Sequence, residues 1–159
     1  MNLVIQNLSF SHDKLRLLKI NFTMNNITTV LKNLQGYPSG IVYNPENKKI
    51  YMSDIVNSKS ISVIDPTTNT VIKNIPVSDR NYNRGDLIYN PSNGYVYVTS
   101  IINNTSTVSI INSTTNKVIK NIPLGNPDST FERNLIYNPT NGYVYLSVKD
   151  SGLQVIKYK

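Results

Sequence analysis

The residues most able to do chemistry gather in two segments, 78–86 and 125–134, where arginines lie beside carboxylates and amides. Arginine can clamp a carboxylate or a phosphate group through two parallel hydrogen bonds, and aspartate or glutamate can accept hydrogen bonds or hold a cation. The candidate binding residues are Arg80, Asn83, Arg84, Asp86, Asp128, Glu132 and Arg133. The simpler interpretation is a set of solvated ion pairs, each contributing about 0 to 1 kcal/mol.

Residues suited to catalysis are scarce. The single histidine, His12, lies beside Asp13 near the start of the chain, and there is no cysteine. Zinc sites and nucleophilic triads therefore lack their usual donors, so we expect no metal, no cofactor and no catalytic residue. A hard cation held through the oxygens of Asp128 and Glu132 stays open, although no EF-hand spacing supports it.

The chain carries a formal charge of +7, from sixteen Lys and Arg against nine Asp and Glu. Because the basic residues are spread through the whole chain, the first interpretation is a soluble, lysine-rich surface. The alternative is attraction to nucleic acid, an anionic glycan or another acidic surface. Tyr82 and Phe131, which lie beside arginines in the two segments, are the candidate stacking residues for a single strand.

A sequence repeat positions these segments. Two aliphatic residues followed by Tyr-Asn-Pro recur at 41–45, 87–91 and 135–139, spaced by 46 and then 48 residues. This period lies between the WD40 repeat of about 40 to 45 residues and the kelch repeat of about 50, and both form four-stranded propeller blades. We therefore predict an all-β protein, a partial or oligomer-completed β-propeller of about three to four blades.

Each repeat predicts four short strands. Asn93-Gly94 and Asn141-Gly142 supply tight turns between the first and second strands, whereas Lys48 must adopt a left-handed conformation in the first copy. The second strand is apolar on both faces, which predicts a position between neighbouring blades. The third alternates, which predicts a place nearer the rim. The fourth, at 70–76 and 117–123, carries Lys and Asn and ends in Pro, as a protected edge strand does.

Function in such a fold is expected on the face that carries the connections from a fourth strand to the next first strand. Those connections are the segments 78–86 and 125–134. Their expected neighbours on the same face are the connections from second to third strands, at 54–59, 101–106 and 149–152.

The repeat resembles a known family. The run Asn-Gly-Tyr-Val-Tyr-Val-Thr-Ser at 93–100 and the run Asp-Pro-Thr-Thr-Asn-Thr-Val-Ile at 65–72, together with Tyr-Asn-Pro, resemble the YVTN family of β-propeller repeats over residues 28–158. The family tetrapeptide appears as Tyr97-Val98-Thr99-Ser100, with Ser where the family has Asn. The resemblance implies a propeller blade, an extracellular or cell-surface location, and no shared catalytic site.

The ends of the chain depart from the repeat. We expect a degenerate N-terminal blade segment at 1–27, in which 20–23 is a third strand, and a fourth strand at 29–34. The repeat region, 28–159, divides into blades at approximately 36–77, 84–124 and 131–158, and the last of these lacks a fourth strand.

Because an unclosed propeller exposes apolar blade faces, three closures stay open. The chain could be part of a longer propeller of about six to eight blades, or a small four-bladed ring. Alternatively, residues 28–34 of one chain could complete the last blade of another, giving a homo-oligomer.

The predicted function is a non-catalytic, surface-structural module that binds a protein or a glycan. One alternative is a lyase-like or lactonase-like propeller enzyme with a cation at the mouth of the channel, and another is a polyanion-binding protein. We expect no transmembrane segment, and no signal peptide because residues 2–22 alternate apolar and polar side chains.

Overall fold

The computed structural model describes residues 17–21, 26–31, 38–54, 59–79, 85–125, 134–148 and 152–158, with side chains from residue 38 onward except that of Asp54. Within these ranges the chain is all-β and contains no helix. The described part accordingly has no helix that could span a membrane. The predicted fold class is confirmed.

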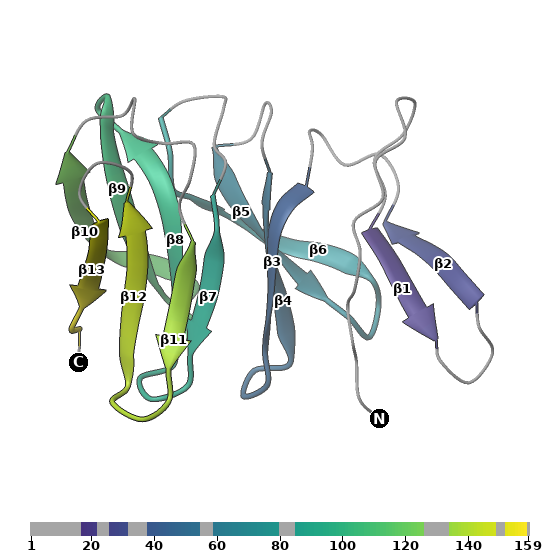
Figure 1. Ribbon diagram of the computed structural model, residues 1–159. Coiled ribbons are helices and arrows are strands. Elements are labelled where there is room, and N and C mark those ends of the chain that lie inside the picture. Colours follow the sequence, from purple (N-terminus) through teal and green to yellow (C-terminus); the bar gives the residue numbers. More distant parts are fainter. Residues whose placement is uncertain are drawn as a thin grey trace.

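The strands form four antiparallel sheets that follow one another in sequence order (Figure 1). The first sheet contains β1 (Leu17–Asn21) and β2 (Asn26–Leu31). The second contains β3 (Pro38–Asn44), β4 (Lys49–Asp54), β5 (Ser60–Asp65) and β6 (Thr70–Pro76). The third contains β7 (Leu87–Asn90), β8 (Tyr95–Ile102), β9 (Thr105–Asn112) and β10 (Lys117–Gly125). The fourth contains β11 (Leu135–Asn138), β12 (Tyr143–Val148) and β13 (Gly152–Ile156).

We call the last three sheets blades 1, 2 and 3. In each blade a four-residue turn joins the first strand to the second, and the left-handed residue of that turn is Lys48, Gly94 or Gly142. Their φ angles are 56°, 72° and 74°, so the prediction that Lys48 adopts a left-handed conformation is confirmed. Figure 1 places these turns at one end of the molecule and the connections between blades at the other, which we call the turn end and the loop end.

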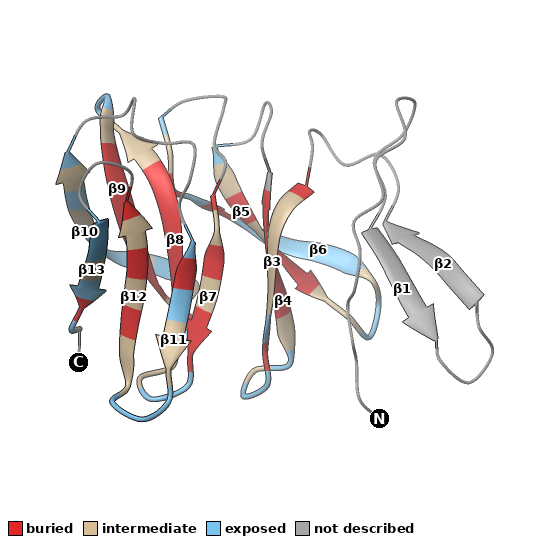
Figure 2. Cartoon of the chain, in the orientation of Figure 1, coloured by how far each residue is buried: buried red, intermediate tan, exposed pale blue. Residues whose placement is uncertain are grey.

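Two apolar clusters hold the blades together. The first joins Tyr51, Ile61 and Val63 of blade 1 to Leu87, Val96, Val98 and Ile111 of blade 2. The second joins Tyr97, Val108 and Ile110 of blade 2 to Leu135, Val144, Leu146 and Ile156 of blade 3. Both faces of β8 are buried, as predicted for a strand between two blades, and Figure 2 shows this strand largely in red.

The third strand lies next to the outermost strand of its blade, as predicted, but in blade 2 it is more deeply buried than an alternating strand usually is. Six consecutive residues of β9, from Ser106 to Ile111, are buried, although polar and apolar types are mixed along this run. The polar members are hydrogen-bonded inside the sheet: Ser109 Oγ lies 3.1 Å from Ser100 Oγ, and Thr107 Oγ1 donates to Thr105 O over 3.0 Å. Satisfied hydroxyl groups can be buried at little cost, so alternation did not indicate exposure here.

The edge strands agree with the sequence. Along β6 only Ile75 is buried, and β10 is exposed or half-buried throughout (Figure 2). Blade 3 ends after three strands within the described residues, as predicted. The N-terminal strands β1 and β2 each begin three residues before their predicted starts, because they pair from Leu17↔Leu31 to Asn21↔Asn26. The other predicted residues of these strands, 22–23 and 32–34, lie outside the described ranges.

Candidate functional site

The candidate site predicted from sequence lies at the loop end. Of its seven residues the structure describes Asp86, at the end of the connection between blades 1 and 2. The other six, Arg80, Asn83, Arg84, Asp128, Glu132 and Arg133, lie outside the described residues, and their roles stay predictions. What the structure does describe is how the stems of the two connections are held.

Asp86 links two blades through its carboxylate. Its Oδ2 accepts a hydrogen bond of 2.6 Å from the backbone N–H of Leu135, the first residue of the innermost strand of blade 3. Its Oδ1 accepts a bond of 3.0 Å from the N–H of Leu87. Residue 86 ends the first connection and Leu135 follows the second, so this bond brings the ends of both candidate segments together.

The environment of Asp86 makes its charged form costly. Burial raises the pKa of its carboxyl group, and the bonds from Leu135 and Leu87 oppose that rise without cancelling it. The ion pair found among the described residues joins Lys49 to Asp65 at a distance of 2.8 Å, away from this carboxylate. Asp86 is therefore held by backbone donors, which suits a carboxylate that fixes a loop stem.

A hydroxyl group at one repeat position supports each loop stem. Ser53, Thr99 and Ser147 occupy equivalent places on the second strands, and each side-chain oxygen accepts a bond from the backbone N–H just before or within the first strand. The donors are Gly40, Asp86 and Asn134, at 2.8, 2.9 and 3.1 Å. Sequence reasoning missed this role. Its signal was a Ser or Thr at the third position of the YVTN-like tetrapeptide in all three repeats.

Blade 1 also contacts the end of the first connection. Ser53 Oγ lies 2.5 Å from the carbonyl oxygen of Gly85 and can donate to it. A side chain at Gly40 would place its Cβ 2.7 Å from that oxygen and 2.8 Å from Leu87 Cδ1. Glycine at position 40 therefore permits the close approach of the two blades at the loop end.

The start of the same connection is fastened to β8 and to the turn that follows it. Ser78 Oγ donates to the carbonyl oxygen of Ile101 over 2.9 Å, and Asp79 Oδ2 accepts a bond of 2.6 Å from the N–H of Asn103. Residues 78–79 and 85–86 are thus tied to the scaffold on both sides of 80–84. These stems hold in fixed positions the two ends of the segment that contains Arg80, Asn83 and Arg84.

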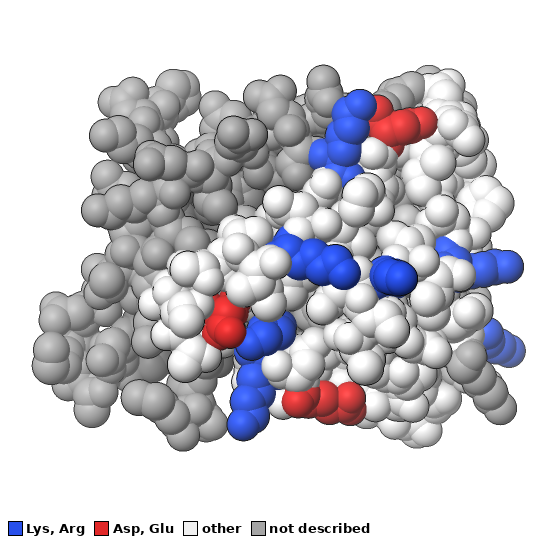
Figure 3. Space-filling view, turned by 180° about the vertical axis from the view of Figure 1, so that it is seen from behind, with Lys and Arg blue, Asp and Glu red and all other residues white. Residues whose placement is uncertain are grey.

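Positive charge is dispersed over the described surface. Its cations are all lysines, because Arg16, Arg80, Arg84 and Arg133 lie outside the described ranges. Figure 3 shows the lysine side chains on the rear face separated by neutral surface rather than gathered in one block. The described lysines therefore do not form a single polyanion-binding patch on that face.

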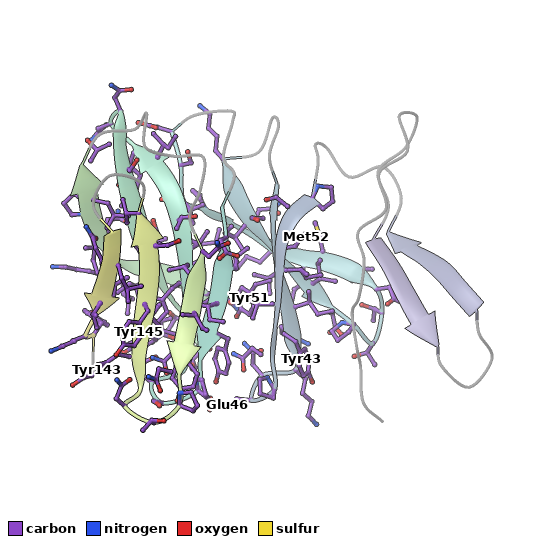
Figure 4. The ribbon with its side chains drawn as sticks, viewed as in Figure 1. Tyr43, Glu46, Tyr51, Met52, Tyr143 and Tyr145 are labelled. Carbon is purple, nitrogen blue, oxygen red and sulfur yellow. The ribbon has the colours of Figure 1, made fainter. Side chains whose placement is uncertain are left out.

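At the turn end, two asparagines in each of blades 1 and 2 join that blade to the next one. The amide Nδ2 of Asn47 donates to Tyr51 Oη over 3.0 Å and to the carbonyl oxygen of Ser113 in blade 2 over 3.0 Å. Asn93 repeats this arrangement with Tyr97 Oη at 2.9 Å and the carbonyl oxygen of Tyr158 at 2.8 Å. Figure 4 labels Tyr51 and the equivalent Tyr145 of blade 3.

The asparagine of each Tyr-Asn-Pro motif holds its own turn, and those of blades 1 and 2 also reach the next blade. Its Oδ1 accepts a bond from the N–H two residues ahead, at 2.9 Å for Asn44, 2.8 Å for Asn90 and 2.9 Å for Asn138. The Nδ2 of Asn44 reaches Ser113 Oγ in blade 2 at 2.8 Å, and that of Asn90 reaches the carbonyl oxygen of Gly142 in blade 3 at 3.0 Å. The turn end is therefore a structural seam between blades.

One buried polar atom at the turn end is unpaired. Within the described residues the hydroxyl group of Tyr89 has no hydrogen-bond partner, and burial together with the nearby Glu46 carboxylate raises its pKa to about 12. Its counterpart in blade 3, Tyr137, lies 2.7 Å from Ser92 Oγ, and Ser92 occupies the place of Glu46 in the next repeat. The neighbour of Tyr137 is therefore a serine hydroxyl, whereas the neighbour of Tyr89 is a carboxylate.

The repeated sheets and the contacts between them define a partial β-propeller, and comparison with solved structures agrees. The chain is similar to Kuenenia stuttgartiensis hydrazine synthase, with a TM-score of 0.71 and 16% identity over 92% of this chain and 46% of that one. It is also similar to a proposed 6-phosphogluconolactonase from Bacteroides fragilis, with a TM-score of 0.62 and 15% identity over 92% and 45% of the two chains. A third is an auxiliary nutrient binding protein from Bacteroides thetaiotaomicron, with a TM-score of 0.56 and 11% identity over 87% and 40%.

These likenesses show the fold alone, because the identities are low. The chain spans less than half the length of each of the three. No family model matches it, and no curated protein sequence does.

Proposed function

We propose that this chain is a non-catalytic β-propeller module that binds a protein or a glycan at its loop end, through Arg80, Asn83, Arg84, Asp128, Glu132 and Arg133, with Asp86 as the residue that holds the stems of the two connections. The single observation that carries the proposal is the bond of 2.6 Å between Asp86 Oδ2 and the Leu135 N–H. It joins the ends of the two arginine-containing connections, which supports a binding surface shared by both. Loops presented from a rigid scaffold are the usual location of binding residues.

The way Asp86 is held argues against a catalytic role for this residue. Both of its oxygens accept backbone hydrogen bonds, so this carboxylate is already committed to the scaffold. Within the described residues no group of three His, Cys, Asp or Glu side chains could hold a metal ion. The lactonase-like alternative therefore depends on Asp128 and Glu132.

We further propose that the repeats are of the YVTN type and that the protein acts in an extracellular or cell-surface setting. The hydroxyl groups of Ser53, Thr99 and Ser147 give the third position of the tetrapeptide a repeated structural task, which supports the first proposal. The second is supported by the family resemblance, and by analogy with the nutrient-binding neighbour.

The test is a labelled chain applied to a glycan microarray and to a displayed peptide library. We expect a selective ligand whose binding is abolished when Arg80, Arg84 and Arg133 are replaced together by Ala. The matched control replaces Lys73 and Lys120, which lie on the outer strands, and should keep that ligand. Equal losses of binding in both variants would mean diffuse attraction and would contradict a site at the loop end.

Two further measurements distinguish the alternatives. If the ligand is a single-stranded nucleic acid, its affinity should fall steeply with salt, and the arginine variant should lower the slope by about 0.7 for each phosphate that is no longer neutralised. If the chain is a lactonase-like enzyme, it should hydrolyse 6-phosphogluconolactone in the presence of a divalent cation. That activity should then disappear when Asp128→Asn and Glu132→Gln are combined.

A further inference from the structure

The outer face of blade 3 repeats the face through which blade 2 binds its neighbour. In blade 2 this docking face contains Ile88, Tyr97, Val108 and Ile110. It packs against blade 3, where the receiving residues are Leu135, Val144, Leu146, Val148 and Ile156. Blade 1 uses Tyr51, Ile61 and Val63 in the same way toward blade 2. The same apolar contact is thus made twice in succession.

The strand registers identify the equivalent face of blade 3. Ile88 pairs with Tyr97 and Tyr97 with Ile110, just as Ile136 pairs with Tyr145 and Tyr145 with Val155. Thr99 pairs with Val108 as Ser147 pairs with Leu153. We call the set Ile136, Tyr145, Leu153 and Val155 the free face.

The free face is apolar and open to solvent. Ile136 is 62% exposed, Leu153 69% and Val155 43%, whereas Val108 and Ile110 of the docking face are fully buried. Such a contiguous apolar surface on a sheet is typical of an interaction site.

The polar part of the docking arrangement is present as well. Asn47 and Asn93 each donate to a carbonyl oxygen of the following blade, at 3.0 and 2.8 Å. Asn141 holds the same place in blade 3 and donates to Tyr145 Oη at 2.8 Å, with no acceptor from a further blade among the described residues. The free side of blade 3 therefore repeats the apolar residues of the first three strands and the asparagine through which blade 2 contacts its neighbour.

The opposite side of the repeats is already covered. On blade 1 the residues equivalent to the receiving face are Ile50, Met52 and Ile64, and their exposed fractions are 4%, 1% and 1%. A second copy could therefore not offer these residues to the free face. Its receiving element must precede β3, where the β1–β2 sheet lies next to blade 1 in sequence order (Figure 1).

We propose that the free face binds the N-terminal end of a second copy of this chain, and that two such head-to-tail contacts close a ring. The interface would continue the contact that joins blade 1 to blade 2 and blade 2 to blade 3. The chain matches 46% and 45% of the length of two solved neighbours, so two copies supply about the length of one of them. Ring closure buries the remaining apolar faces and leaves no open end, as in closed cyclic assemblies. This inference is independent of which ligand the loop end binds.

The first test is the mass of the chain in solution, measured by light scattering or sedimentation between about 1 and 100 µM. We expect a single species with the mass of two chains. Leu153→Glu should weaken the association by at least about tenfold, because it places a charge in an apolar contact. Ile136→Glu provides a second variant on another strand, and both side chains are exposed in the single chain, so the β-sheet circular dichroism should persist.

The matched control is Ile72→Glu, which changes an exposed isoleucine on the outer strand β6 and should leave the two-chain species intact. A monomer at the highest concentration would overturn the proposal. So would a ladder of growing species, because the ring would then not close on two copies. Association unchanged in both Leu153→Glu and Ile136→Glu would also overturn it.

A second test fixes the orientation of the two copies. The chain has no cysteine, so single cysteines can be introduced at Leu153 in one preparation and at Thr28 of β2 in another, isotopically labelled preparation. A flexible bismaleimide should join residue 153 of one copy to residue 28 of the other. Joining of 153 to 153 instead would show a face-to-face dimer and would contradict the head-to-tail arrangement.

Discussion

The carboxylate of Asp86 accepts the backbone N–H of Leu135 across the boundary between blades 2 and 3, with Oδ2 2.6 Å from the nitrogen. Replacing Asp86 with Ala should therefore destabilise the fold by about 1 to 3 kcal/mol, because two half-buried N–H groups lose their acceptor. Asp86→Asn keeps one acceptor oxygen and should destabilise less. Urea unfolding measures both, with Asp79→Ala, an exposed acid of the same connection, as the milder control. Equal destabilisation by Asp86→Ala and Asp79→Ala would contradict the linking role.

The raised pKa of Asp86 predicts a sign for the dependence of stability on pH. Because the folded-state pKa lies above the usual value of 3.8, the folded chain binds more protons than the unfolded chain between those two values. The contribution of Asp86 to the free energy of unfolding therefore falls as pH rises through this window. Urea unfolding at a series of pH values should show that fall in the parent chain and a smaller one in Asp86→Asn. An identical profile for the two proteins would mean that the carboxyl group is not perturbed.

The ion pair between Lys49 and Asp65 should give the free energy of unfolding the opposite dependence on pH, with stability lost as the pH falls. The Lys49 ammonium, with Thr67 donating to the same carboxylate, lowers the pKa of Asp65. Stability from this group is present above the usual value of 3.8 and disappears as pH falls toward the lowered value. Asp65→Asn should remove that acid sensitivity in the same unfolding series. Because the pair is solvated, we expect a small effect at neutral pH.

Gly40→Ala should weaken the packing of blade 1 on blade 2 and so lower the free energy of unfolding. Its Cβ would lie 2.7 Å from a backbone oxygen, which cannot move without shifting the chain, so we expect a destabilisation of about 1 to 3 kcal/mol. Gly152→Asn is the control, because nothing lies within 4 Å of a Cβ there and asparagine tolerates its φ of 73°. Thermal unfolding compares the two. A fully stable Gly40→Ala would show that the blades can separate at the loop end without cost.

The two equivalent tyrosines Tyr89 and Tyr137 should respond differently to removal of their hydroxyl groups. Tyr89→Phe removes a buried oxygen that lacks a partner among the described residues, so stability should stay the same or rise by up to about 1 kcal/mol. Tyr137→Phe removes the bond to Ser92 and should cost about 0.5 to 1.5 kcal/mol. Chemical denaturation of the two variants measures both changes. A Tyr89→Phe variant that is less stable than Tyr137→Phe would contradict these hydrogen bonds.

Much of the architecture could be predicted from the repeat. The Tyr-Asn-Pro motif, the turn at Lys48 and the edge lysines each have a local cause that is visible in the sequence, and each was found where expected. The burial of β9 could not be predicted in this way. Ser109 and Thr107 look like exposed positions until their hydrogen-bond partners are known, and those partners lie elsewhere in the sheet or along the strand.

The sequence could predict where Asp86 lies along the chain but not the structural role of its carboxylate. Sequence reasoning placed Asp86 among the ligand-binding residues by its proximity to arginines. Its bond to Leu135 joins residues 49 positions apart, and that pairing depends on how blades 2 and 3 stack. The same holds for Asn47 and Asn93, whose acceptors lie 66 and 65 positions away. Hydrogen bonds of this kind depend on how the blades pack against one another. A single sequence shows the donor or the acceptor but not which residue is its partner.

The connections at the turn end have a fixed length, whereas those at the loop end vary in length between repeats. Each first turn closes a strand pair five positions apart, as in Asn44↔Lys49, Asn90↔Tyr95 and Asn138↔Tyr143. At the loop end the equivalent pairs Tyr51↔Val63, Tyr97↔Ile110 and Tyr145↔Val155 differ in separation. Differences in length between the repeats are thus accommodated at the loop end, whereas the first turn has the same length in all three. A peptide grafted between residues 80 and 84 would change what the protein displays while leaving the angular spacing of its blades untouched.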